Sequence, residues 1–165
     1  MRGRGRYQLG AVLLLLFALD FVVRPLFGHG RIAPDFLLLA LLVYSIGTRP
    51  GNAAIAGLLV GLIRDGLVPV TFGAGAFAHT IIGYMSAWSK AVFFADNLYV
   101  NAALFFFGCW LRDVLTWLIG RHPEEWTEVL WQLGYWSPLQ ALTTAASGMI
   151  ILLVFRRWLH VRIGE

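Results

Sequence analysis

Long apolar stretches separated by short polar or Pro/Gly-containing connections make up most of the chain. A helix rises about 1.5 Å per residue, so roughly 20 apolar residues cross a hydrocarbon core of about 30 Å. The pattern predicts an all-α polytopic membrane protein, a single integral membrane domain over residues 1–165 with six transmembrane helices. The predicted spans are residues 9–24, 32–48, 51–68, 72–88, 98–120 and 138–156.

A different pattern lies between the last two spans. Residues 123–135 begin with a proline and two glutamates, a typical helix start, and then separate apolar from acidic positions. This amphipathic pattern predicts a helix that lies in the membrane interface. Trp126, Trp131 and Trp136 would belong to the aromatic belt there, and we expect them to anchor a partner on the outer side.

Basic residues are distributed unevenly over the predicted connections. With six spans, eight of them would lie on the side of the termini and three on the opposite side. The first set is Arg2, Arg4, Arg6, Arg49, Lys90, Arg156, Arg157 and Arg162, and the second is Arg24, Arg31 and Arg121. Because cytoplasmic connections carry the excess of Lys and Arg, both termini are predicted to be cytoplasmic.

Small residues form one face of the third predicted span. Ala53, Gly57 and Gly61 recur every four positions and lead to Asp65. Membrane helices associate where small residues let their backbones approach closely. We expect this face to be a packing seam that receives a second copy of the chain or the span of a partner.

Charged residues also occur within or beside the spans, where they are costly and by default suggest function. They are Asp20, Arg24, Asp35, Arg64, Asp65, Arg112 and Asp113. The structural alternative is that the long side chains snorkel to the headgroups. Three of the aspartates lie at similar depths in outward-running spans, so we expect one polar cluster beneath the outer face. It would either lock the bundle or line a small outward-facing cavity.

The spacing of these charges suggests their partners. Asp20 and Arg24 are four residues apart and can pair along one helix. Adjacent residues point about 100° apart on a helix, which argues against pairing within each Arg-Asp dyad. The dyads are therefore predicted to pair crosswise, Arg64 with Asp113 and Arg112 with Asp65.

Composition narrows the function classes. The chain is 59% hydrophobic and only 13% charged, and a net charge of +4 on such a protein does not indicate a nucleic-acid partner. Cys109 is the only cysteine, which excludes an intrachain disulfide and a multi-cysteine metal site. No motif unites a nucleophile with a base, so we expect no catalytic residue, metal or cofactor. His79 is expected to be hydrogen-bonded or to face lipid.

Several short motifs, in their order and spacing, resemble the bacterial rod-shape-determining membrane protein family MreD. They are Pro34–Leu39 (PDFLLL), Arg49-Pro50-Gly51, Gly57–Asp65 (GLLVGLIRD), Phe72-Gly73 and Gly83-Tyr84. Family members often have proline directly before the Phe/Leu-Gly pair, whereas this chain has Thr71 there and Pro69 two residues earlier. The shape of that loop is therefore left open.

The resemblance implies a non-enzymatic component of the cell-wall elongation machinery in the bacterial inner membrane. It implies binding to MreC and, through MreC, contact with the wall-synthesising enzymes and with cytoplasmic MreB filaments. It also implies a fold similar to the substrate-binding subunits of energy-coupling-factor vitamin transporters. The alternative function is a substrate-capture subunit of such a transporter, and an intramembrane enzyme is a third, less supported class. A homodimer is a further expected assembly.

Overall fold

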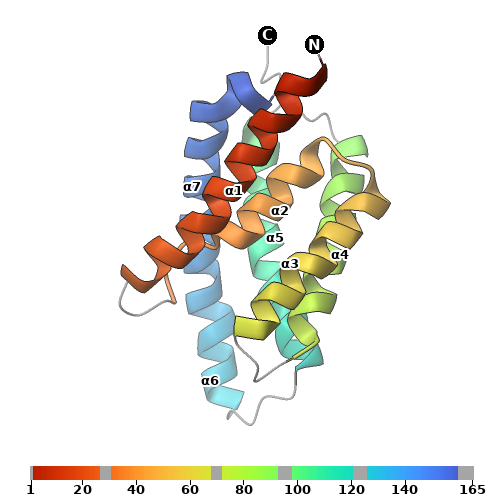
Figure 1. Ribbon diagram of the computed structural model, residues 1–165. Coiled ribbons are helices and arrows are strands. Elements are labelled where there is room, and N and C mark those ends of the chain that lie inside the picture. Colours follow the sequence, from red (N-terminus) through yellow and green to blue (C-terminus); the bar gives the residue numbers. More distant parts are fainter. Residues whose placement is uncertain (1, 27–30, 68–71, 93–97, 121–125, 160–165) are drawn as a thin grey trace.

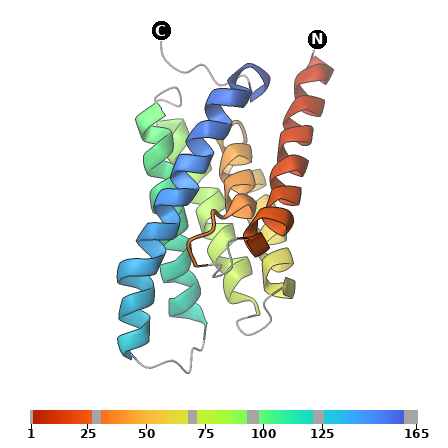
Figure 2. The same cartoon turned by 90° about the vertical axis from the view of Figure 1, so that its left-hand side faces the viewer.

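The computed structural model describes residues 2–26, 31–67, 72–92, 98–120 and 126–159, and every element in these ranges is a helix. The elements are α1 (Arg2–Leu26), α2 (Phe36–Ile46), α3 (Pro50–Leu67), α4 (Ala74–Val92), α5 (Leu98–Ile119), α6 (Trp126–Trp131), η2 (Gln132–Trp136) and α7 (Ser137–Leu159). They form an elongated bundle with the start of α1 and the end of α7 at one end and α6 at the other (Figures 1 and 2). The predicted all-α class is confirmed for these residues.

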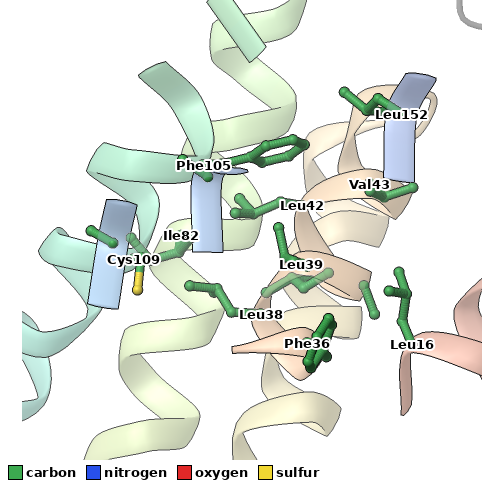
Figure 3. Packing of buried hydrophobic residues seen from close by; sticks show 14 of the residues in the cluster. Leu16, Phe36, Leu38, Leu39, Leu42, Val43, Ile82, Phe105, Cys109 and Leu152 are labelled. Carbon is green, nitrogen blue, oxygen red and sulfur yellow. The ribbon is translucent and has the colours of Figure 1, made fainter. Parts of the chain in front are cut away.

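Helix α2 lies in the centre of the bundle and is buried on nearly all sides. Its Leu38, Leu39 and Leu42 share the main apolar cluster with Phe105 and Cys109 of α5 (Figure 3). The helix has 11 residues, so at about 1.5 Å per residue it is about 16 Å long, roughly half of the hydrocarbon core. The second predicted span, residues 32–48, therefore contains a helix too short to cross a membrane alone.

Helices α3 and α4 pack together along the predicted small-residue face. The buried residues of α3 are Ala53, Gly57, Gly61 and Asp65. A Cβ at Gly57 would overlap the backbone of His79, and one at Gly61 would overlap the backbone of Ala76. The seam is therefore confirmed, but α4 of the same chain fills it. The expectation that it receives a second copy or a partner's span is wrong.

A continuous helix runs from α6 through η2 into α7. Its apolar part, Trp126–Phe155, has 30 residues. The expected amphipathic helix over residues 123–135 is thus joined to the sixth span instead of being separated from it. Its first three residues, 123–125, lie outside the described residues.

The π-helical turn η2 ends two residues before Pro138. The N–H of Ser137 donates to the carbonyl of Gln132, five residues earlier. This leaves the carbonyl of Leu133 without its usual donor, and Pro138 has no N–H to replace it. The indole Nε1 of Trp110 donates to that carbonyl at 3.1 Å instead. The bond fastens η2 to α5.

Two described helices are long and apolar enough to cross a membrane, Leu98–Ile119 and Trp126–Phe155. Shorter apolar helices cover Gly10–Val23 and Phe36–Ile46. The crossing of all six predicted spans stays a prediction. The loop with Pro69 and Thr71, whose shape the sequence left open, lies outside the described residues.

Candidate functional site: a buried charge network

Buried carboxylates gather at the amino-terminal end of α2. The Asp35 carboxylate precedes the first helical residue and accepts a hydrogen bond from the N–H of Leu38 at 2.9 Å. The Asp20 carboxylate of α1 accepts one from the N–H of Phe36 at 3.1 Å. The first N–H groups of a helix lack intrahelical partners and carry a partial positive charge. Two carboxylates are therefore stabilised at one buried helix start.

Arg64 of α3 joins these two carboxylates. Its Nη1 lies 3.6 Å from Oδ2 of Asp20, and its Nη2 lies 3.2 Å from Oδ2 of Asp35. The side chain of Asp35 is 0% exposed. A charge buried this completely needs a partner of opposite sign, because an unpaired one costs several kcal/mol after desolvation. Arg64 thus connects α1, α2 and α3 at one point.

Arg112 of α5 extends the network to the other side. Its Nη1 contacts the same Oδ2 of Asp35, while its Nε and Nη2 donate to Oδ1 of Asp113 at 2.9 and 2.6 Å. The second oxygen of Asp113 accepts a hydrogen bond from the hydroxyl of Ser137 at 2.6 Å. Asp35 therefore lies between two guanidinium groups, and Asp113 links α5 to the start of α7.

Polar side chains of α7 complete the cluster, and the sequence analysis missed them. Gln140 Nε2 donates to the carbonyl of Ala33 at 3.1 Å, and the Thr144 hydroxyl accepts from the N–H of Asp35 at 3.1 Å. These bonds hold the non-helical approach to α2 against α7. The available signal was the i, i+3, i+7 spacing of residues 137, 140 and 144, which places three polar side chains on one face of an apolar helix.

The pairing differs from the predicted one. Asp20, Asp35, Arg64, Arg112 and Asp113 do come together in one network, but both arginines meet at Asp35 instead of crosswise. The adjacent residues Arg112 and Asp113 do pair, so the prediction that they would not is wrong. The long arginine side chain folds toward the following carboxylate, which a comparison of Cβ directions alone does not capture.

Asp65 has a separate role from the network. Its Oδ2 accepts hydrogen bonds from the N–H groups of Gly73 at 2.8 Å and Ala76 at 3.0 Å, which caps the start of α4. Gly73 has a φ of 95°, a left-handed conformation that favours glycine. A Cβ at Gly75 would overlap the Asp65 carboxylate. The predicted Arg112–Asp65 pair is therefore wrong, because this carboxylate joins the ends of α3 and α4.

Two other candidate residues are placed differently. His79 is 1% exposed and its Nδ1 lies 2.7 Å from the carbonyl oxygen of Gly75 on its own helix, which confirms the expectation of a hydrogen-bonded histidine. The side chain of Arg24 lies outside the described part of the chain. Its pairing with Asp20 stays a prediction.

The three candidate tryptophans lie on α6 and η2, at the end of the bundle away from the start of α1 (Figure 1). Trp126 packs edge-on against Trp117 of α5, with ring centroids 5.7 Å apart. Trp131 projects outward, and Trp136 is half-buried under the guanidinium of Arg31, 5.7 Å from its ring. Trp126 and Trp131 are therefore exposed, whereas Trp136 is half-buried.

The charge network supports a mechanical role. Its carboxylates and guanidinium groups bond to one another, to a helix start and to polar side chains of α7. Among the described residues, no group of three His, Cys, Asp or Glu side chains is arranged to hold a metal ion. The arrangement fastens α1, α2, α3, α5 and α7 to one another.

Comparison with known proteins identifies the family. No curated protein and no solved structure matches the chain. A family model described as rod shape-determining protein MreD matches residues 1–156. Since this match covers nearly all of the 165 residues, the chain belongs to the MreD family of rod shape-determining membrane proteins.

Proposed function

We propose that the chain is a membrane scaffold of the cell-wall elongation machinery. In this role it binds MreC and helps couple peptidoglycan synthesis to cytoplasmic MreB filaments. Membership of the MreD family supplies the role in rod-shape determination. The observation that carries the scaffold role is the ion-pair network around Asp35, which unites helices from the whole length of the chain. A rigid support is what an assembly factor needs.

The proposed topology has six crossings and both termini in the cytoplasm. The start of α1 and the end of α7 lie at the same end of the bundle, which supports termini on one side of the membrane (Figures 1 and 2). The distribution of basic residues in the sequence favours the cytoplasm for that side. Helix α6 then lies at the extracytoplasmic end.

The length of the last helix supports an outer recognition surface. The 30 residues of Trp126–Phe155 extend about 45 Å at about 1.5 Å per residue, which exceeds a hydrocarbon core of about 30 Å. With the end of α7 at the cytoplasmic side, the excess belongs to α6 and η2. Their exposed Leu130 and Trp131 are available to MreC beyond the hydrocarbon.

The alternative, a substrate-capture subunit, needs charged groups that are free to bind a polar ligand. Arg64 Nη1 has no hydrogen-bond partner among the described residues and lies 3.6 Å from Oδ2 of Asp20. The carboxylates of Asp35 and Asp113, however, are held by Arg112 and by backbone or hydroxyl donors. Their geometry favours a lock over a ligand cavity.

Co-expression with MreC from the same organism tests the scaffold. The chain is purified by an affinity tag in mild detergent, and the retained MreC is quantified against a tagged membrane protein of similar size. The proposal predicts that MreC is retained in a fixed stoichiometric ratio. Retention no higher than with the control protein would contradict it.

A further inference from the structure

A stripe of exposed residues on α6 and η2 lines a shallow hollow that is open to the outside. The spacing of the stripe is i, i+3, i+4, i+7, i+8, which places all its members on one helix face. The stripe consists of Thr127, Leu130, Trp131, Gly134 and Tyr135, which together line a hollow of about 430 Å³. Leu130 is 71% and Trp131 64% exposed, whereas Val129 on the opposite face is buried. The stripe therefore faces away from the bundle.

The π-helical turn contributes Gly134 and Tyr135 to the lining of the hollow. Trp131 and Tyr135 form one wall, with ring centroids 5.9 Å apart in an edge-on arrangement. A Cβ at Gly134 would meet no atom within 4 Å, so this glycine leaves open space between the aromatic side chains. The bond from Trp110 to the carbonyl of Leu133 fixes the turn beneath it. Such turns often mark functional sites.

Charge indicates what the hollow can bind. Helix α6 and η2 contain one acidic residue, the exposed Glu128, and no Lys or Arg. In the sequence, Glu124 and Glu125 precede this helix, although their positions lie outside the described residues. The nearest described cation is Arg31, which stacks on the Trp136 ring at 5.7 Å. The residues that line the hollow include no Lys or Arg to attract anionic lipid headgroups. A basic protein segment is electrostatically complementary to it.

We infer that this hollow docks a helical segment of an extracytoplasmic partner, with an apolar side chain over Gly134 and Lys or Arg facing Glu128. Desolvated pockets with aromatic walls are where interfaces concentrate their binding energy. Glu128 lies three residues before Trp131, so its carboxylate is on the neighbouring part of the same face. The inference rests on the proposed function, because it assigns the docking site for MreC.

Two substitutions test the hollow in the full chain co-expressed with MreC. Gly134→Leu fills the open space, and Glu128→Lys reverses the charge beside it. The matched control is Gly66→Leu, another exposed helical glycine whose added Cβ would meet nothing within 4 Å. We expect each test variant to lower MreC retention by about tenfold, the order of a hot-spot loss. The control should retain MreC like the wild type, and all three should keep the thermal unfolding midpoint.

The outcomes separate the docking site from the scaffold. If the wild type retains MreC and both test variants do too, the hollow is not the docking site and the scaffold stands. If the wild type itself fails to retain MreC, the scaffold and the docking site are both overturned. If the variants lose co-purifying phosphatidylglycerol while MreC retention is unchanged, the hollow binds lipid and the inference is overturned.

Discussion

At the start of α2, two arginines and three aspartates bond to one another inside the bundle, whereas on α6 and η2 the side chains of Leu130, Trp131 and Tyr135 are exposed. The inner network uses charge, the costliest kind of group in a bilayer, and leaves Asp35 with no exposed surface. The outer stripe uses apolar groups where the helix extends beyond the predicted hydrocarbon. Charged side chains are buried in the first region and apolar side chains are exposed in the second, and both arrangements are unfavourable without a compensating partner.

The two regions differ in whether groups of the same chain supply the compensating contacts. Asp35 finds its partners in the same chain, namely Arg64, Arg112 and the N–H of Leu38. The hollow over Gly134 meets no partner in the described part of the chain. The buried charges are therefore satisfied within the fold, whereas the exposed aromatic stripe is the surface that we propose another molecule covers.

The largest expected effect is that of Arg112→Leu. This change leaves Asp35 and Asp113 without their shared guanidinium inside the bundle, which is expected to cost about 3–5 kcal/mol of the free energy of unfolding. Unfolding in detergent, followed by circular dichroism, measures it. Glu128→Gln, which neutralises an exposed charge, serves as the control. An unfolding curve for Arg112→Leu equal to that of the wild type would contradict the claim that the buried charge network stabilises the fold.

A second effect concerns the α3–α4 seam. Gly61→Leu forces a side chain into the backbone of Ala76, so it should destabilise the chain by about 1–3 kcal/mol or more. Gly66→Leu on the same helix meets open space and should cost far less. The comparison of their thermal unfolding midpoints is the measurement. Equal midpoints would mean that α3 does not pack on α4 through this face.

A smaller effect is expected for Asp65→Ala. This change removes the acceptor for the N–H groups of Gly73 and Ala76 at the start of α4. Loss of such a cap typically costs about 0.5–2 kcal/mol. Asp65→Asn keeps an acceptor oxygen and should recover part of the loss in the same unfolding measurement. If Asp65→Ala and Asp65→Asn lowered the free energy of unfolding equally, the contribution of Asp65 would come from its negative charge and a charged partner, and not from its hydrogen bonds to the start of α4.

The smallest effect on stability is predicted for Trp131→Ala. The side chain is 64% exposed, so its removal should change the free energy of unfolding by no more than about 0.5 kcal/mol. The same variant should retain less MreC, because the side chain lines the hollow. A loss of stability as large as that of Arg112→Leu would show that the stripe belongs to the core.

The sequence predicted the features that depend on local pattern. The periodicity of Ala53, Gly57 and Gly61 identified a packing seam, because close backbone approach requires small residues at that spacing. The cost of charge in lipid likewise indicated that the intramembrane aspartates and arginines would meet. Neither argument says which helices are neighbours, so the seam was assigned to a partner and the ion pairs were drawn crosswise.

The missed features depend on tertiary placement. Residues 32–35 lie within the predicted second span, but Asp35 caps α2, and side chains of α7 bond to the carbonyls of Ile32 and Ala33. Asp65 could not be distinguished from the other aspartates until the start of α4 was placed beside it. The π-helical turn precedes Pro138, which by pattern alone predicts a new helix start.

Native mass spectrometry of the chain released from mild detergent with co-expressed MreC tests most directly whether the inner charges form a lock. The prediction is a mass equal to the chain with MreC and lipids, and no small polar molecule bound in stoichiometric amount. A small polar molecule that stays bound to the wild type and is lost on Asp35→Asn or Arg112→Lys would contradict the lock, because it would make the network a ligand site.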